Sequence, residues 1–110
     1  MATEKKEVTL YGVIVDKWDG KPTAKFYELK ALETEKQYQL DKGTRYFYIS
    51  RINKSALIDN AWVDEFGGKF IGTTKQGVIR AVIEYFEGEI KEYEARIAIA
   101  NEYIEEVKKL

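Results

Sequence analysis

The sequence predicts an α+β fold, in which an antiparallel β-meander of four to six short strands precedes one long C-terminal amphipathic helix. Runs of β-branched and aromatic residues, separated by glycine-containing turns, occupy residues 7–72 and are typical of short antiparallel strands. Residues 73–110 instead repeat apolar side chains at helical spacing. We expect a single domain, residues 1–110, with a polar arm at residues 1–6 and a helix that packs both on the sheet and on a partner chain.

The C-terminal helix carries a heptad repeat, abcdefg, that does not slip. Isoleucine occupies a (Ile83, Ile90, Ile97 and Ile104), and other residues with apolar bodies occupy d (Ile79, Phe86, Tyr93, Ala100 and Val107). A strict period of about 3.5 residues, held for about four heptads, is typical of a helix that pairs with another helix. We therefore expect a homo-oligomer whose interface contains Ile90, Tyr93, Ile97, Ala100, Ile104 and Val107.

The ends of this helix and its course are also predicted. Thr73 and Gln76 have the spacing of a capping box, in which each side chain bonds a backbone N–H of the other residue. Gly88 lies at position f, away from the heptad stripe. The alternative to a projecting helix is a bend at Gly88 that folds the chain back on its own sheet.

The apolar surface is wider near the start of the helix than near its end. Val78, Val82 and Tyr85 add apolar side chains outside the a and d positions. We therefore expect residues 78–90 to pack on the sheet and residues 90–107 to be available to a second chain.

Turn-forming residues divide residues 7–72 into strands. Residues 8–18 predict the first strand, in which Gly12 indicates a bulge or a close approach of another part of the chain. Asp19 and Gly20 then predict a hairpin turn. Further strands are predicted at residues 24–32, 37–40 and 45–51, and a last hairpin at residues 62–71 leads to the helix.

Absent residue types exclude several chemistries. The chain has no cysteine and no histidine, which excludes disulfides, thiol catalysis and the commonest metal ligand and general base. Neighbouring carboxylates of the sequence point apart on a strand or a helix, so they predict no catalytic acid pair. We expect a protein that is not an enzyme, with no catalytic residues, no metal and no cofactor.

Charge and hydropathy restrict the partners and the location. The formal charge of −1 at pH 7 gives no general attraction to nucleic acid or to anionic membranes. The sequence shows neither a long apolar run nor a hydrophobic leader. We therefore expect a cytoplasmic protein with no membrane partner.

Residues 36–54 form a basic segment interleaved with aromatic residues. Five basic residues and one acidic residue give it a charge of +4, whereas the whole chain carries −1. Guanidinium groups pair with oxyanions and aromatic faces stack on bases, so the segment predicts a site for a phosphorylated nucleotide. The alternative is a solvated rim of the sheet. The candidate ligand-binding residues are Arg45, Tyr46, Tyr48, Arg51, Asn53 and Lys54.

The end of this segment offers a second argument for anion binding. Asn53, Lys54 and Ser55 present an amide, an ammonium group and a hydroxyl. Ser55 is predicted to cap a short helical turn at residues 56–59, and a helix N-terminus suits a phosphate. The alternative is a plain capped turn that binds nothing.

The layout of the chain resembles that of small accessory proteins of bacteriophages. The resemblance is carried by the short meander, by the strand exit from Tyr46 to Ser55 and by the terminal amphipathic helix that begins Thr-Thr-Lys-Gln. In outline the chain is similar to the Thoeris anti-defence sponges, which combine an antiparallel sheet with C-terminal helical packing, oligomerise and sequester a cyclic nucleotide signal. The resemblance implies an oligomeric nucleotide-binding protein; the candidate residues above come from charge and aromatic pattern alone.

We therefore expect a non-enzymatic binding protein, of the phage anti-defence type, that sequesters a phosphorylated or cyclic nucleotide. Two alternatives have the same outline. One is a protein–protein interaction module that inhibits a host protein through its helix or through the aromatic patch around Trp62 and Phe66. The other is a structural component of a phage.

Overall fold

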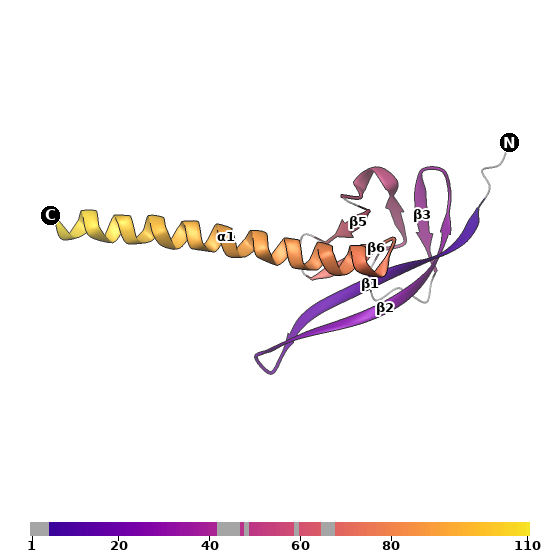
Figure 1. Ribbon diagram of the computed structural model, residues 1–110, viewed down its shortest axis with the longest axis horizontal. Coiled ribbons are helices and arrows are strands. Elements are labelled where there is room, and N and C mark those ends of the chain that lie inside the picture. The colour runs from indigo at the N-terminus through magenta and orange to yellow at the C-terminus, as the bar shows by residue number, and fades with distance from the viewer. Residues whose placement is uncertain (1–4, 42–46, 48, 59, 65–67) are drawn as a thin grey trace.

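The structure, a computed structural model, describes residues 5–41, 47, 49–58, 60–64 and 68–110. It contains one antiparallel sheet followed by one long helix (Figure 1), which confirms the α+β prediction. The elements are β1 (Lys6–Trp18), β2 (Lys21–Glu33), β3 (Gln37–Leu40), β4 (Arg51–Asn53), the 3-10 turn η2 (Lys54–Ala56), β5 (Ala61–Val63), β6 (Lys69–Gly72) and α1 (Lys75–Lys108). Across the sheet, the strand order is β4-β3-β2-β1-β6-β5.

The sheet curls towards a barrel because its two edges are joined by a short link. β4 and β5 lie at opposite edges, which would be roughly 24 Å apart if the strands lay flat at about 4.8 Å spacing. Residues 54–60 connect them, starting with η2 and ending in a tight turn where the backbones of Ile58 and Ala61 bond each other. So short a link cannot span a flat sheet, and the edges must approach one another.

The β1–β2 hairpin is the longest part of the sheet. The two strands pair from Lys6 opposite Glu33 to Trp18 opposite Lys21. Asp19 and Gly20 between them have positive φ angles of 56° and 78°, as the predicted two-residue hairpin turn requires. Because β6 pairs with β1 from Tyr11 to Ile14, the end of the hairpin projects beyond β6 (Figure 1).

Alternate residues of β1 face two separate apolar cores. Leu10 faces the inner core, inside the curled sheet, and Val13 faces the outer core, between the sheet and α1. Because both faces of β1 are covered, its middle is a nearly continuous apolar run. The buried residues are Leu10, Leu29, Ala31, Phe47, Ile52 and Ile71 in the inner core, and Val13, Phe70 and Val78 in the outer core.

Gly12 allows an aromatic ring to approach β1 closely. A Cβ atom at this position would lie 2.5 Å from Phe47 Cζ and 3.0 Å from Leu29 Cδ1. The Phe47 ring also meets the Tyr27 ring edge-on, with 5.7 Å between centroids. Of the two predictions for Gly12, the close approach is confirmed, and the continuous pairing of β1 with β2 shows no bulge there.

The fourth strand differs from the prediction. It is Arg51–Asn53 and not residues 45–51, of which 45, 46 and 48 lie outside the described residues. Phe47 lies in a 3-10 turn and is 1% exposed, because its ring fills the inner core. Burial of this ring therefore outweighs the local preference of the segment for a strand.

The cap of α1 is one residue later than predicted. The Thr74 hydroxyl accepts a hydrogen bond from the Gly77 N–H at 2.9 Å. The Thr73 N–H instead donates to the Asn60 carbonyl at 3.1 Å, which ties Thr73 to the turn before β5. The predicted capping box of Thr73 and Gln76 is therefore wrong, because a contact with a distant turn decides where the helix begins.

α1 packs on the sheet through its first turns and then projects away from it (Figure 1). Val78 is buried and Val82 and Tyr85 are half-buried, whereas every side chain from Ile90 to Leu110 is exposed. The radius of gyration is 19.0 Å and the longest extent 72 Å, against about 13 Å for the radius of a compact domain of this size. The alternative of a bend at Gly88 is therefore wrong.

Within the described residues, no helix combines the length and apolarity that crossing a membrane requires.

Two glycine substitutions test the packing. Gly12→Ala should lower the free energy of unfolding by about 1–3 kcal/mol, because the added methyl group overlaps the Phe47 ring. Gly88→Ala meets nothing within 4 Å and should raise it by up to about 1 kcal/mol, since alanine is the better helix former. Urea unfolding of the two variants measures both effects; a Gly12→Ala protein as stable as its parent would contradict the close approach of Phe47.

Candidate functional site

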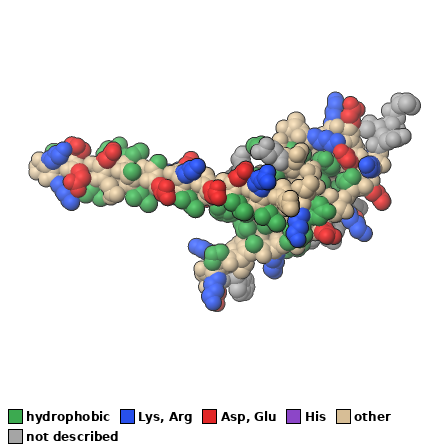
Figure 2. Space-filling view, viewed as in Figure 1, with side chains coloured by type: hydrophobic (Ala, Val, Ile, Leu, Met, Phe, Trp, Pro, Cys, Tyr) green, Lys and Arg blue, Asp and Glu red, His purple; other side chains and the backbone are tan. Residues whose placement is uncertain are grey.

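An exposed apolar seam runs along α1. We define the seam as the a and d residues Ile79, Ile83, Phe86, Ile90, Tyr93, Ile97, Ala100, Ile104 and Val107, all of which are exposed. Exposure reaches 60% at Ile97 and 64% at Val107. Figure 2 shows apolar side chains along the projecting helix and a denser apolar area where the helix leaves the sheet. The six residues predicted to form an oligomer interface are thus accessible on the described chain.

Two apolar hollows lie between α1 and the β1–β2 hairpin. The large hollow, about 880 Å³, opens at the end of the hairpin and is lined by Val15, Asp16, Lys17, Pro22, Thr23, Ala24, Gly68, Val82, Tyr85, Phe86 and Glu89. The small hollow, about 300 Å³, lies nearer the start of the helix, where Ala24 and Phe26 face Ile79 and Ile83. Because seam residues line both hollows, the apolar surface continues from the hairpin on to the projecting seam.

Aromatic rings form the wall of the large hollow on the helix side. The Tyr85 ring meets the Phe70 ring and the Phe86 ring edge-on, with centroid distances of 5.6 and 5.1 Å. A hydrogen bond to the Glu89 carboxylate raises the pKa of Tyr85, and the negative charge of Glu89 adds to the effect. The hollow therefore combines a packed apolar wall with charged residues of both signs, Asp16, Lys17 and Glu89.

The residues predicted to bind a nucleotide do not form a described cluster of free cations. Arg51 and Asn53 are exposed on the edge strand β4, while Arg45, Tyr46 and Tyr48 lie outside the described residues. The Lys54 ammonium donates to Glu33 Oε2 at 2.7 Å and lies 5.3 Å from the centroid of the Tyr38 ring. Its charge is thus already paired within the sheet, and nucleotide binding at this edge stays a prediction.

The predicted helical cap at Ser55 is wrong. The turn η2 is Lys54–Ala56, so Ser55 lies inside it, and its N-cap is Asn53, which makes no side-chain capping bond. The turn starts at Lys54 because the Lys54 N–H donates to the Lys36 carbonyl at 2.8 Å, which holds the chain against β3 up to that point. A single short turn of this kind adds no helix N-terminus for a phosphate.

The contact between Glu33 and Lys54 changes the titration of three groups. The hydrogen bond from Lys54 lowers the pKa of Glu33, and the same bond raises the pKa of Lys54. Burial raises the pKa of Tyr38, and the nearby charge of Glu33 raises it further. Glu33 and Lys54 thus form a structural ion pair that joins the end of β2 to the exit of β4.

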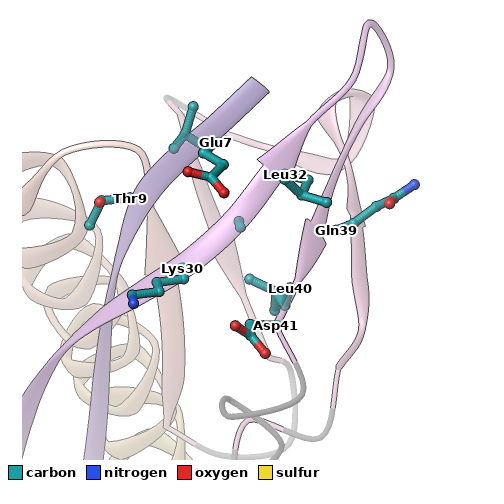
Figure 3. Close-up of a pocket in the computed structure, with 9 residues that line it drawn as sticks. Glu7, Thr9, Lys30, Leu32, Gln39, Leu40 and Asp41 are labelled. Carbon is teal, nitrogen blue, oxygen red and sulfur yellow. The ribbon is translucent and has the colours of Figure 1, made fainter. Parts of the chain in front are cut away.

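An open groove of about 780 Å³ crosses the opposite end of the sheet (Figure 3) and was not indicated by the sequence. Its polar lining residues come from three neighbouring strands and the residue after β3, and include Glu7, Lys30 and Asp41. Figure 3 shows the Lys30 and Gln39 side chains extending in opposite directions. The lining carries two carboxylates and one ammonium group, a net negative charge that does not favour a phosphate. Among the described residues, no cluster of acidic side chains suits a metal ion.

Comparisons of the chain with protein-family models, with curated proteins and with solved structures found no match. The resemblance to phage anti-defence sponges therefore stays a prediction.

A substitution tests the ion pair through its pH dependence. Glu33→Gln should lower the Tm slightly at pH 7, because it removes the charge that Lys54 binds. The pKa of Glu33 is lowered in the folded state, so its stabilisation is present above the unfolded pKa and is lost as the pH falls through the folded pKa. Thermal unfolding should show the Tm difference disappearing below about pH 4. An unchanged difference at pH 2.5 would show that the carboxylate charge is not the cause.

Proposed function

We propose that this protein is a non-enzymatic protein–protein interaction module that self-associates through the seam of α1. The observation that supports the proposal is the exposed heptad stripe on the part of the helix that projects beyond the sheet, from Ile90 to Val107. A stripe of this length and period matches the packing surface of a coiled coil. Contiguous apolar surface of this kind commonly marks an interaction site.

The projecting part of the helix would gain stability from a partner. Residues 90–108 extend beyond the sheet as a continuation of the docked first turns, and their side chains are all exposed, so tertiary packing within the chain adds nothing to their helical stability. The ion pairs there, Lys108 with Glu105 and Lys109 with Glu106, are exposed and contribute little. Burial of the seam against a second apolar helix would stabilise the segment through the hydrophobic effect.

Nucleotide sequestration, the function expected from the sequence, has less support from the described residues. It relies on a group of cations, and Lys54, which is half-buried, is already bound by Glu33. The seam requires no rearrangement before a partner can bind to it. Self-association is compatible with an anti-defence role, which stays a prediction.

Binding to a host protein is a second candidate, favoured by apolar side chains outside the seam. Ile99 is 51% exposed and Tyr103 is 69% exposed, and a two-helix pairing along the seam leaves Ile99, at position c, uncovered. Aromatic and aliphatic side chains of this kind anchor many interfaces. A pull-down from a bacterial lysate with the parent protein and with Ile99→Lys would reveal a partner that depends on Ile99.

A pair of matched variants tests self-association. Light scattering at tens of micromolar should give the parent protein at least twice its chain mass of 12.8 kDa. Ile97→Glu should weaken association by about tenfold or more, because it places a charge in the centre of the seam. Glutamate is a good helix former, so the loss would not come from helix propensity.

Ala95→Glu is the control, since position 95 is an f position on the opposite side of the same helix. It should leave the mass of the assembly unchanged. A parent protein that is monomeric at tens of micromolar, or equal weakening by both variants, would refute the proposal.

A further inference from the structure

We propose that the partner on the seam is a second copy of this chain bound antiparallel, with the two helices crossing between Ala98 and Ile99 so that residues 87–110 of each chain overlap. The proposal rests on the self-association proposed above and specifies its geometry. The overlap begins where the β1–β2 hairpin ends beside α1 and extends for about 35 Å to the C-terminus. Within the overlap, 14 residues of each chain occupy the a, d, e and g positions that face the partner in a coiled coil.

Side-chain volumes favour the antiparallel arrangement. In this register Ile90 lies opposite the partner's Val107, Tyr93 opposite the partner's Ile104, and Ile97 opposite the partner's Ala100. Every layer then combines one larger and one smaller side chain, which allows even packing. A parallel pair in register would instead place two tyrosines in one layer and two alanines in another, which overfills the first and leaves a gap in the second.

Charges beside the seam favour the same register. The e and g positions of paired helices meet across the interface and set its orientation. Here Glu87 meets the partner's Lys108, Glu94 meets the partner's Asn101, and Arg96 meets the partner's Tyr103. No like charges meet at these positions, and the exposed bond of Lys108 to Glu105, at 3.4 Å, is weak enough to be exchanged.

Other arrangements bring like charges together or bury less of the seam. A parallel pair in register places Glu89 against the partner's Glu94 on both sides. An antiparallel pair moved one heptad towards the sheet places Glu94 against the partner's Glu94 and Arg96 against the partner's Arg96. An antiparallel pair moved one heptad the other way pairs Ile97 with the partner's Val107 and Ala100 with the partner's Ile104, and so pairs fewer of the six projecting seam residues with one another.

The hairpin also determines how far a partner helix can extend. The side of α1 that carries Ile79 and Ile83 faces Ala24 and Phe26 across the small hollow, whose volume of about 300 Å³ holds no helix. A parallel partner in register would need this space for its own residues 79–86. In the antiparallel pair the partner's Leu110 instead lies beside Glu89, at the mouth of the large hollow.

Cysteine trapping distinguishes these arrangements, because the chain has no cysteine of its own. When each is oxidised alone, the Ile90→Cys and Val107→Cys proteins should form no disulfide. An equimolar mixture should form a disulfide between one copy of each variant. Glu102→Cys, at an f position away from the seam, is the control for random collision and should not cross-link.

The outcomes separate this proposal from the one that it rests on. Cross-linking of each variant with itself would show a parallel pair, and a dimeric mass without any cross-link would show another register; either result overturns the proposed geometry while self-association stands. A monomeric parent protein would refute self-association itself.

Charge reversal provides an independent test that does not depend on forming a disulfide. Glu87→Lys and Lys108→Glu should each raise the dissociation constant by about tenfold, because each reverses two contacts per dimer. The double variant should bind like the parent, since the charges are exchanged and still opposite. Glu102→Lys should have no effect, and a double variant no better than either single variant would overturn the register.

Discussion

The rest of the structure depends on the two apolar faces of β1. Leu10 closes the inner core of the curled sheet, and Val13 on the other face meets Phe70 and Val78 beneath the helix. A strand with one polar face would support either the sheet or the helix, but not both. Because the two cores share β1, the start of α1 is held in a direction that the curl of the sheet determines.

The difference in size between helix and sheet creates the surface that we assign to self-association. α1 has 34 residues, or about 51 Å at 1.5 Å per residue. The sheet covers the first turns of this helix, and the rest extends beyond it. The apolar stripe nevertheless continues at the same spacing to Val107. A helix with no partner would gain nothing from isoleucine at every a position beyond the sheet, whereas a paired helix buries those residues.

The β1–β2 hairpin restricts how a partner can lie on this surface, because the hairpin lies beside the seam. The end of the hairpin leaves the large hollow between itself and the rings of Tyr85 and Phe86. A second helix that approaches from the free end of α1 meets apolar surface as far as this hollow and then meets the hairpin. The fold therefore limits both the orientation and the length of a partner helix.

The elements that were predicted well are those whose residues interact with near neighbours in the chain. The Asp19–Gly20 turn, the strand Gln37–Leu40 and the heptad stripe depend on local backbone preferences and on spacing, so they are visible in the sequence. The strand at residues 45–51 and the cap at Thr73 were wrong for the opposite reason. Phe47 is drawn into the core over Gly12, and Thr73 is bonded to Asn60, contacts that no local pattern shows.

The same distinction holds for the candidate site. The sequence by itself determined which side of α1 is apolar and that this stripe has the period of a paired helix, because both follow from residue order along a single helix. The tertiary structure alone decided that Lys54 is bound to Glu33 and that the hollows lie beside the seam. It also decided that the stripe stays exposed beyond residue 90. These properties depend on which distant segments the curled sheet brings to the helix and which it leaves in solvent.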